Sequence, residues 1–356
     1  NRKNTIFGGK LLYSRVMKKN TLLAISCILA LGVTGCDKTP EGGASKVNGL
    51  AGGKVTVGES RGSYENLLIL SEGQMGSNNA SLDLFNPESG IYVRSAFSKA
   101  NPDISLGDTA NDIICVGDEI WIAVCGSDLI EIIDRETLKH KDAVAVVTPR
   151  YMATDGESVF VTSWNGAYTT YNGSWEIVDY RNPKGAVFKI NASTRKTEGS
   201  VGTGYQPEGI VLAGESLYVA NSGGISSLTG PDYAYDNTVT VIDRASFKVT
   251  ATTDARINAK EIFSDSKGGV YEHILGDYSS VHSGLYKITS DGAVKVADFV
   301  SAIAQDGDDF WILGTEDEFA WNKAEKEYHV FKISDGEASR VDITVTAAYP
   351  YGIAVD

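Results

Sequence analysis

The stretch GIVLAGESLYVANS (residues 209–222), followed by TVTVIDRASFKVTAT (residues 238–252), decides the fold. In the first stretch, two apolar runs flank a tight turn at Gly214, and Leu217 and Val219 alternate with a tyrosine. The second stretch alternates in the same way on both sides of a short polar turn. Alternation with a period of two predicts four consecutive antiparallel strands, here called a, b, c and d.

The same four-strand unit recurs along the chain, and no segment shows a sustained helical period. Regular four-stranded units predict an all-β protein, a β-propeller whose blades pack face to face. Further a–b pairs occupy residues 112–124, 151–163, 261–273 and 302–314, and further c–d ribbons occupy residues 129–144, 186–201, 284–299 and 328–343.

The two ends of the chain bear on the number of blades. The first unit, in residues 66–97, supplies strands b, c and d, and the final YPYGIAVD (residues 349–356) matches strand a. The C-terminal strand would complete the first blade and close a ring of six. The alternative is that the sequence stops before a further unit, which would give seven blades.

Loop lengths distinguish the two ends of the propeller. The a–b and c–d turns are short, whereas most b–c connections are long. In a four-stranded meander the b–c and d–a connections share one end, here called the loop end, and the opposite end is called the turn end. The long connections are residues 72–80, 163–184, 221–237, 272–283 and 314–327.

The loop end is predicted to be aromatic and to bind a ligand, because clustered Trp and Tyr on a rigid scaffold are common anchors of recognition. The alternative is that the long loops bury their aromatic side chains in small local clusters. The candidate ligand-binding residues are Trp164, Tyr168, Tyr171, Trp175, Tyr205, Tyr233, Tyr235, His273, Tyr278, His282, Trp321 and Tyr349.

The N-terminal region indicates export. From Met17 the chain reads MKKNTLLAISCILALGVTGC, with two lysines, an apolar run and small residues before Cys36. This order is typical of a signal peptide and resembles a lipobox, so residues 17–36 are predicted to be a lipoprotein signal peptide with Cys36 lipidated. The apolar run is short for a membrane span. Residues 1–16 are interpreted as an untranslated leader, residues 37–63 as a flexible glycine-rich tether, and residues 64–356 as the propeller.

The net charge limits the possible binding partners, and the positions of the cysteines bear on whether a disulfide forms. The first 36 residues carry six Lys and Arg and no acid, so 26 basic and 46 acidic residues remain beyond them. This balance argues against nucleic acid or an anionic membrane surface as partner. A turn at Gly117-Asp118 places Cys115 opposite Ile120 and Cys125 opposite Ala110 on the other face, so two free thiols are expected rather than a disulfide.

Three strings carry a family resemblance. NLLILSEGQMGSNNASLDLFNPESG (residues 66–90), SLGDTANDI (residues 105–113) and VANSG with NTVTVID (residues 219–223 and 237–243) resemble the YncE-like propeller lipoproteins, and most of all the BtuG-type proteins. The resemblance implies a seven-bladed propeller on the outer membrane, facing the cell exterior. It would capture vitamin B12 and other corrinoids and pass them to the TonB-dependent transporter BtuB. The chain departs from this pattern by ending before a seventh unit and by lacking an acidic run after Cys36.

Two other functions stay open, because fold does not fix function. Glu272, His273 and His282 would be the acid–base group of a propeller lyase or hydrolase, and the aromatic loops would suit glycan or protein adhesion. No G-x-S-x-G, H-E-x-x-H, P-loop or dinucleotide signature occurs, so a non-enzymatic role is favoured. We expect no intrinsic cofactor or metal site, although His273 or His282 would be able to reach the cobalt of a corrinoid as an axial ligand.

Overall fold

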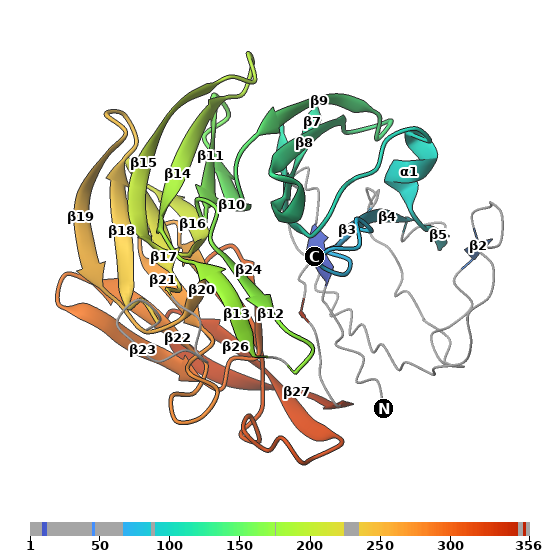
Figure 1. Ribbon diagram of the computed structural model, residues 1–356. Helices are drawn as coiled ribbons and strands as arrows, with labels where there is room; N and C mark the ends of the chain where they lie inside the picture. The colour runs from blue at the N-terminus through green and yellow to red at the C-terminus, as the bar shows by residue number, and fades with distance from the viewer. Residues whose placement is uncertain are drawn as a thin grey trace.

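The structure, a computed structural model, describes residues 9–12, 45–46, 67–86, 90–174, 176–223, 235–347 and 352–353. These residues form a six-bladed β-propeller of antiparallel sheets, which confirms the predicted fold class. In Figure 1 the blades follow one another in chain order, from the blue strands of blade 1 to the red strands of blade 6. Within each blade the sheet runs from strand a near the centre to strand d at the outside.

Blades 2 to 6 each have four strands in the order that the sequence predicts. Blade 2 is β6 (Ala110–Val116), β7 (Glu119–Val124), β8 (Leu129–Asp134) and β9 (His140–Ala145). Blade 3 is β10 (Pro149–Thr154), β11 (Ser158–Ser163), β14 (Lys184–Asn191) and β15 (Thr197–Tyr205). Blade 4 is β16 (Pro207–Ala213), β17 (Ser216–Asn221), β18 (Thr238–Asp243) and β19 (Lys248–Asp254). Blade 5 is β20 (Ala259–Ser264), β21 (Val270–Ile274), β22 (Gly284–Thr289) and β23 (Gly292–Asp298), and blade 6 is β24 (Ala302–Asp306), β25 (Asp309–Gly314), β26 (Lys326–Ser334) and β27 (Glu337–Ala347).

Blade 1 is assembled differently. Its central strands are β3 (Leu67–Ser71), β4 (Ser81–Asn86) and β5 (Ile91–Val93), flanked by β1 (Gly9–Leu12) beside β3 and β2 (Ser45–Lys46) beside β5. Strand β1 therefore takes the position that the sequence analysis gave to the C-terminal strand. Of that C-terminal segment the structure describes only Gly352 and Ile353, neither of which is in a strand.

Side chains alternate between the two faces of each strand b. One set therefore packs against the preceding blade, and the other set packs against the following blade. Leu217 and Val219 pack toward blade 3, whereas Tyr218 and Ala220 pack toward blade 5. Five apolar clusters of this kind each join two successive blades, from blade 1 through to blade 6. A sixth cluster is built from blade 6 and Ile353. Burial between blades is thus the main stabilising term of the fold.

The hairpin of blade 2 confirms the predicted turn and pairs Cys115 with Ile120. Gly117 has φ +59°, a conformation that glycine adopts at no steric cost. The prediction for Cys125 was wrong by one residue, because a bulge pairs Ala110 with Val124 and leaves Cys125 in the short helix η1 (Cys125–Ser127). Neither cysteine is in a disulfide, as predicted, with Cys125 buried and Cys115 half-buried.

Two local elements differ from the expected loops. The b–c connection of blade 3 contains a separate hairpin, β12 (Tyr168–Tyr171) and β13 (Ile177–Arg181), which stands out from its blade (Figure 1). Aromatic and β-branched residues favour such pairing even where a regular burial pattern is absent. A single turn of helix, α1 (Ala96–Ala100), follows β5. Within the described parts of the chain, no helix is long and apolar enough to span a membrane.

Candidate functional site

A repeated backbone link fixes the loop end of blades 2 to 5. The residue before each strand a has a positive φ, and its carbonyl accepts a hydrogen bond from the N–H of the residue that follows strand b. Each link joins the d–a and b–c connections of one blade without using a side chain. The pairs, with the acceptor first, are Thr109 and Cys125, Thr148 and Trp164, Gln206 and Ser222, and Asn258 and Leu275.

Directly after this link, each strand a has a β-bulge that carries a polar residue. Bulges bend a strand and redirect a side chain. The innermost strands of blades 2 to 5 pack side by side, so these residues gather at the loop end around the centre, in a set that we call the central polar group. Its members are Asn111, Arg150, Glu208 and Lys260.

Arg150 joins blades 3 and 4 within the central polar group. Its guanidinium donates to both carboxylate oxygens of Glu208, at 3.1 and 3.2 Å, and lies 4.2 Å from the ring centroid of Trp164. Burial raises the pKa of Glu208, and the charge of Arg150 opposes that rise. Burial likewise disfavours the charged form of Arg150, but the Glu208 carboxylate, together with Cys125 and Tyr151, outweighs burial and raises the pKa of Arg150. The side chain of Arg150 is only 14% exposed, so the pair is held in the interior.

Trp164 therefore packs against this buried cluster and is not an exposed ligand-binding residue. Its indole nitrogen lies close enough to Glu208 to lower the pKa of that carboxyl. The nitrogen nevertheless makes no hydrogen bond of good geometry within the described residues. Sequence reasoning identified Trp164 but missed Arg150 and Glu208. The recurring strings TAND, TPRY, QPEG and NAKE at the start of each strand a are the signal that would have found them.

A second cluster, which is open to solvent, lies between blades 5 and 6. Nδ1 of His282 is 2.8 Å from Oε2 of Glu318, and the imidazole stacks on Phe319 with centroids 4.3 Å apart. Phe319 in turn stacks on Trp321, whose side chain is 57% exposed. Two predicted site residues, His282 and Trp321, are therefore brought together by residues 314–327. We call this set the His282 cluster.

His273 does not belong to that surface. It lies inside β21, is 2% exposed, and both ring nitrogens are engaged, with Glu261 at 2.9 Å and the carbonyl of Val300 at 2.8 Å. The expectation that His273 stands on a loop is corrected, because β21 extends to Ile274 and leaves no loop residue before Leu275. The predicted acid–base group is thus split between the interior and the surface.

Glu272, the strand neighbour of His273, is fully buried among apolar residues. Its Oε1 accepts a hydrogen bond from the backbone N–H of Arg256 at 2.8 Å, whereas Oε2 has no partner in the described structure. Burial raises the pKa of the Glu272 carboxyl to about 8, because the charged form is poorly solvated there.

The other predicted site residues are dispersed over the loop end. Tyr168 on β12 is exposed and donates to Asp179 at 2.9 Å, and Tyr278 is exposed on the b–c connection of blade 5. Tyr205 is half-buried with Lys184 over its ring, and the buried hydroxyl of Tyr235 has no partner among the described residues. The side chain of Tyr171 and the whole of Trp175, Tyr233, Tyr349 and Cys36 lie outside the described structure.

Exposed apolar side chains are concentrated at the loop end. Nine large ones are exposed in the described residues, and six of them lie on b–c connections, whereas none lies on a turn of the opposite end. Large exposed apolar side chains that gather at one end of a fold are candidate contacts for a ligand or partner. The six are Met75, Tyr168, Val178, Tyr180, Tyr278 and Trp321.

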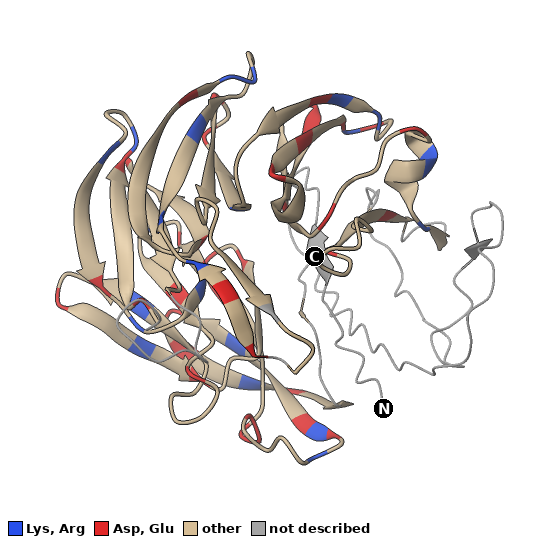
Figure 2. Cartoon of the chain, in the orientation of Figure 1, with Lys and Arg blue, Asp and Glu red and all other residues tan. Residues whose placement is uncertain are grey.

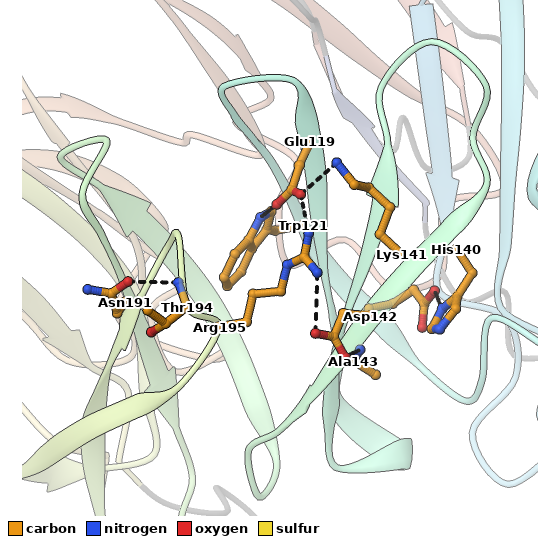
Figure 3. Close-up of polar contacts among 10 residues, drawn as sticks. Glu119, Trp121, His140, Lys141, Asp142, Ala143, Asn191, Thr194 and Arg195 are labelled. Carbon is orange, nitrogen blue, oxygen red and sulfur yellow. Dashed lines mark hydrogen bonds and ion pairs between the residues drawn. The ribbon is translucent and has the colours of Figure 1, made fainter.

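The turn end is polar, and several of its charged side chains form ion pairs. Figure 3 shows Glu119 between Lys141 and Arg195, which link blades 2 and 3. Burial tends to raise the pKa of Glu119, but the hydrogen bonds from these two cations outweigh it and lower the pKa. Acidic and basic residues alternate over the blades rather than forming a patch of one sign (Figure 2). We find no group of three or more His, Cys, Asp or Glu able to hold a metal ion in the described residues.

Comparisons with known proteins add little to this geometry. No family model matches the chain, and no curated protein matches it. Among solved structures, the chain is similar to hydrazine synthase of Kuenenia stuttgartiensis, with 18% sequence identity and a TM-score of 0.49. The match covers 64% of this chain and 63% of that chain, which is less than two thirds of its length. The assignment of a β-propeller therefore rests on the strand order and the packing of the sheets.

Proposed function

We propose that this propeller binds a corrinoid, without catalysis, across its loop end. The observation that carries the proposal is the concentration of exposed large apolar side chains on the b–c connections. Ligand sites combine apolar and aromatic surface with a few polar groups that fix orientation. A corrinoid matches that combination, because it is broad and flat, has apolar patches, and is rimmed by neutral amides.

Unpartnered polar atoms at the same end support an amide-rimmed ligand. A buried polar atom without a hydrogen bond is costly, and it requires a partner such as water or a ligand group. Within the described residues, four such atoms lie at the loop end and include both donors and acceptors. They are Oδ1 of Asn111, Nε1 of Trp164, and the hydroxyl oxygens of Tyr235 and Ser283.

The family resemblance extends the proposal to the cellular setting. YncE-like lipoproteins of the BtuG type imply anchorage to the outer membrane through Cys36 and transfer of the corrinoid to a TonB-dependent transporter of the BtuB type. A net excess of acidic residues is compatible with a neutral ligand and does not select for nucleic acid.

Isothermal titration with cyanocobalamin tests the proposal. We expect one-to-one binding that weakens at least about tenfold in the double variant Tyr278→Ala, Trp321→Ala, since each side chain offers a flat, solvent-exposed surface. The matched control is Val249→Ala, Val294→Ala, which removes two exposed apolar side chains from strands β19 and β23 and should leave binding unchanged.

Two results would contradict the proposal. One is the absence of heat from a chain shown by circular dichroism to be folded, in which case a glycan array becomes the next experiment. The other is equal loss of binding in both double variants, which would place the ligand away from the loop end or indicate a general loss of structure.

A further inference from the structure

His282 lies on the b–c connection of blade 5, between β21 and β22, and its side chain is 38% exposed. A carboxylate of the next blade holds its inner nitrogen, since Oε2 of Glu318 is 2.8 Å from Nδ1. Glu318 is itself fixed, because it accepts hydrogen bonds from the backbone N–H of Ser283 at 3.2 Å on both oxygens. The imidazole is thus oriented from two blades.

Aromatic rings prevent the imidazole from turning. Phe319 stacks on one face with an interplanar angle of 14°, and Phe299 meets the ring edge-on with centroids 4.6 Å apart. Lys326 donates to the carbonyl of Glu318 at 3.0 Å, which anchors the segment that carries both Glu318 and Phe319. A side chain held in this way has already lost most of its rotamer freedom before any ligand arrives.

This arrangement determines which nitrogen is available. A carboxylate at Nδ1 favours the tautomer with the proton on Nδ1, which leaves a lone pair on Nε2. Nε2 has no hydrogen-bond partner among the described residues. A carboxylate behind the imidazole is also the usual support of a histidine that binds a metal, because it fixes the ring and raises its basicity.

A single nitrogen cannot hold a free metal ion, and the described residues provide no cluster of ligands around His282. One nitrogen does suit a metal that brings its in-plane ligands with it, because only the axial positions are then open. The flat face of Trp321, next to Phe319 in the same cluster, is suited to pack beside such a planar macrocycle.

We propose that Nε2 of His282 is an axial ligand to the cobalt of the bound corrinoid. This inference rests on the proposed function, and it adds a coordination bond between His282 and the cobalt of the ligand. The lone pair of Nε2 forms a Co–N bond as a water molecule leaves Co(III). The oxidation state of cobalt does not change, and the tautomer with its proton on Nδ1 toward Glu318 forms the bond without moving that proton.

The test is titration of the full chain with diaquocobinamide, which has exchangeable water on both faces. Absorption spectra and heats of binding are recorded on the same samples. We expect a one-to-one shift of the corrinoid bands to longer wavelength, which His282→Gln abolishes while weakening binding about tenfold. The band shift reports the Co–N bond itself, which a purely structural role of His282 would not give.

His140→Gln is the matched control. His140 is also partly exposed, at 34%, and also has a glutamate on Nδ1, but it lies at the turn end, on β9. The proposal is overturned if the wild-type chain binds with no spectral shift, or if His282→Gln shifts the spectrum as the wild type does. Those outcomes leave the proposed function standing, whereas absence of binding to both diaquocobinamide and cyanocobalamin would remove both. Thermal unfolding of each variant confirms that it is folded.

Discussion

Two clusters at the loop end are built from the same parts and differ in exposure. In one, Arg150 pairs with Glu208 and stacks on Trp164; in the other, His282 pairs with Glu318 and stacks on Phe319. The first is buried between blades 3 and 4, whereas the second is open to solvent. A nitrogen-bearing side chain, a glutamate and an aromatic ring therefore do not define a binding site by themselves. Burial decides whether they stabilise the fold or offer a surface.

The largest effect should follow from Arg150→Ala. It leaves the Glu208 carboxylate buried without its partner, and breaking a buried pair costs about 3–5 kcal/mol of unfolding free energy. Urea denaturation followed by circular dichroism measures this loss. Arg244→Ala, which removes a surface pair with Glu215, is the control and should change little. Equal losses in the two variants would mean that the Arg150 cluster is not a structural centre.

Glu272 sharpens the comparison, since it is a buried glutamate whose Oε2 lacks a partner in the described structure. Burial raises its pKa to about 8 from an ordinary 4.5, so the folded state keeps a proton that the unfolded state has released. The free energy of unfolding should therefore fall as the pH rises from about 4.5 to about 8, by at most about 1.4 kcal/mol per pH unit.

Glu272→Gln removes this dependence, so the variant should become more stable than the wild type as the pH rises. Urea denaturation of both proteins at pH 5, 6.5 and 8 gives the difference at each pH. The exposed Glu215→Gln serves as the control. A difference between Glu272→Gln and wild type that stays constant with pH would show that Glu272 is ionised throughout this range.

The smallest effect on stability should come from Trp321→Ala. The indole is 57% exposed, and surface substitutions usually change the unfolding free energy by less than about 0.5 kcal/mol. The same variant should lose corrinoid affinity, so stability and binding separate in the His282 cluster. They should move together in the Arg150 cluster, where loss of structure comes first. A large stability loss in Trp321→Ala, measured by the same denaturation, would erase the distinction between the clusters.

The sequence predicted those features of the fold that depend on the period of the strands and on the lengths of the loops. Alternation in strands such as β17 identified the blades, and the long b–c connections identified the loop end, where His282 and Trp321 do lie together. It did not predict the central polar group, because a bulge is a local break in the very period used to find strands. It misplaced His273 for a related reason, since a buried glutamate and histidine at the end of β21 look like the start of a polar loop.

Contacts between residues that are far apart in the sequence were also not predicted. Glu318 and His282 are 36 positions apart, and Arg150 and Glu208 are 58 apart, so neither pair forms a local motif. The pairing of the β12–β13 hairpin was likewise missed, because most of its residues are exposed and burial does not alternate along β13.

The backbone link at the start of strand a in blades 2 to 5 has a consequence for engineering. Because that link joins the carbonyl of one residue to the N–H of another, any residue able to adopt the required φ leaves it intact. The connections that follow this link can therefore be exchanged without disturbing it. Loops of other lengths and compositions should be graftable between strands b and c, after the residue that donates to this link, so one scaffold offers several independent positions at which a recognition surface can be changed.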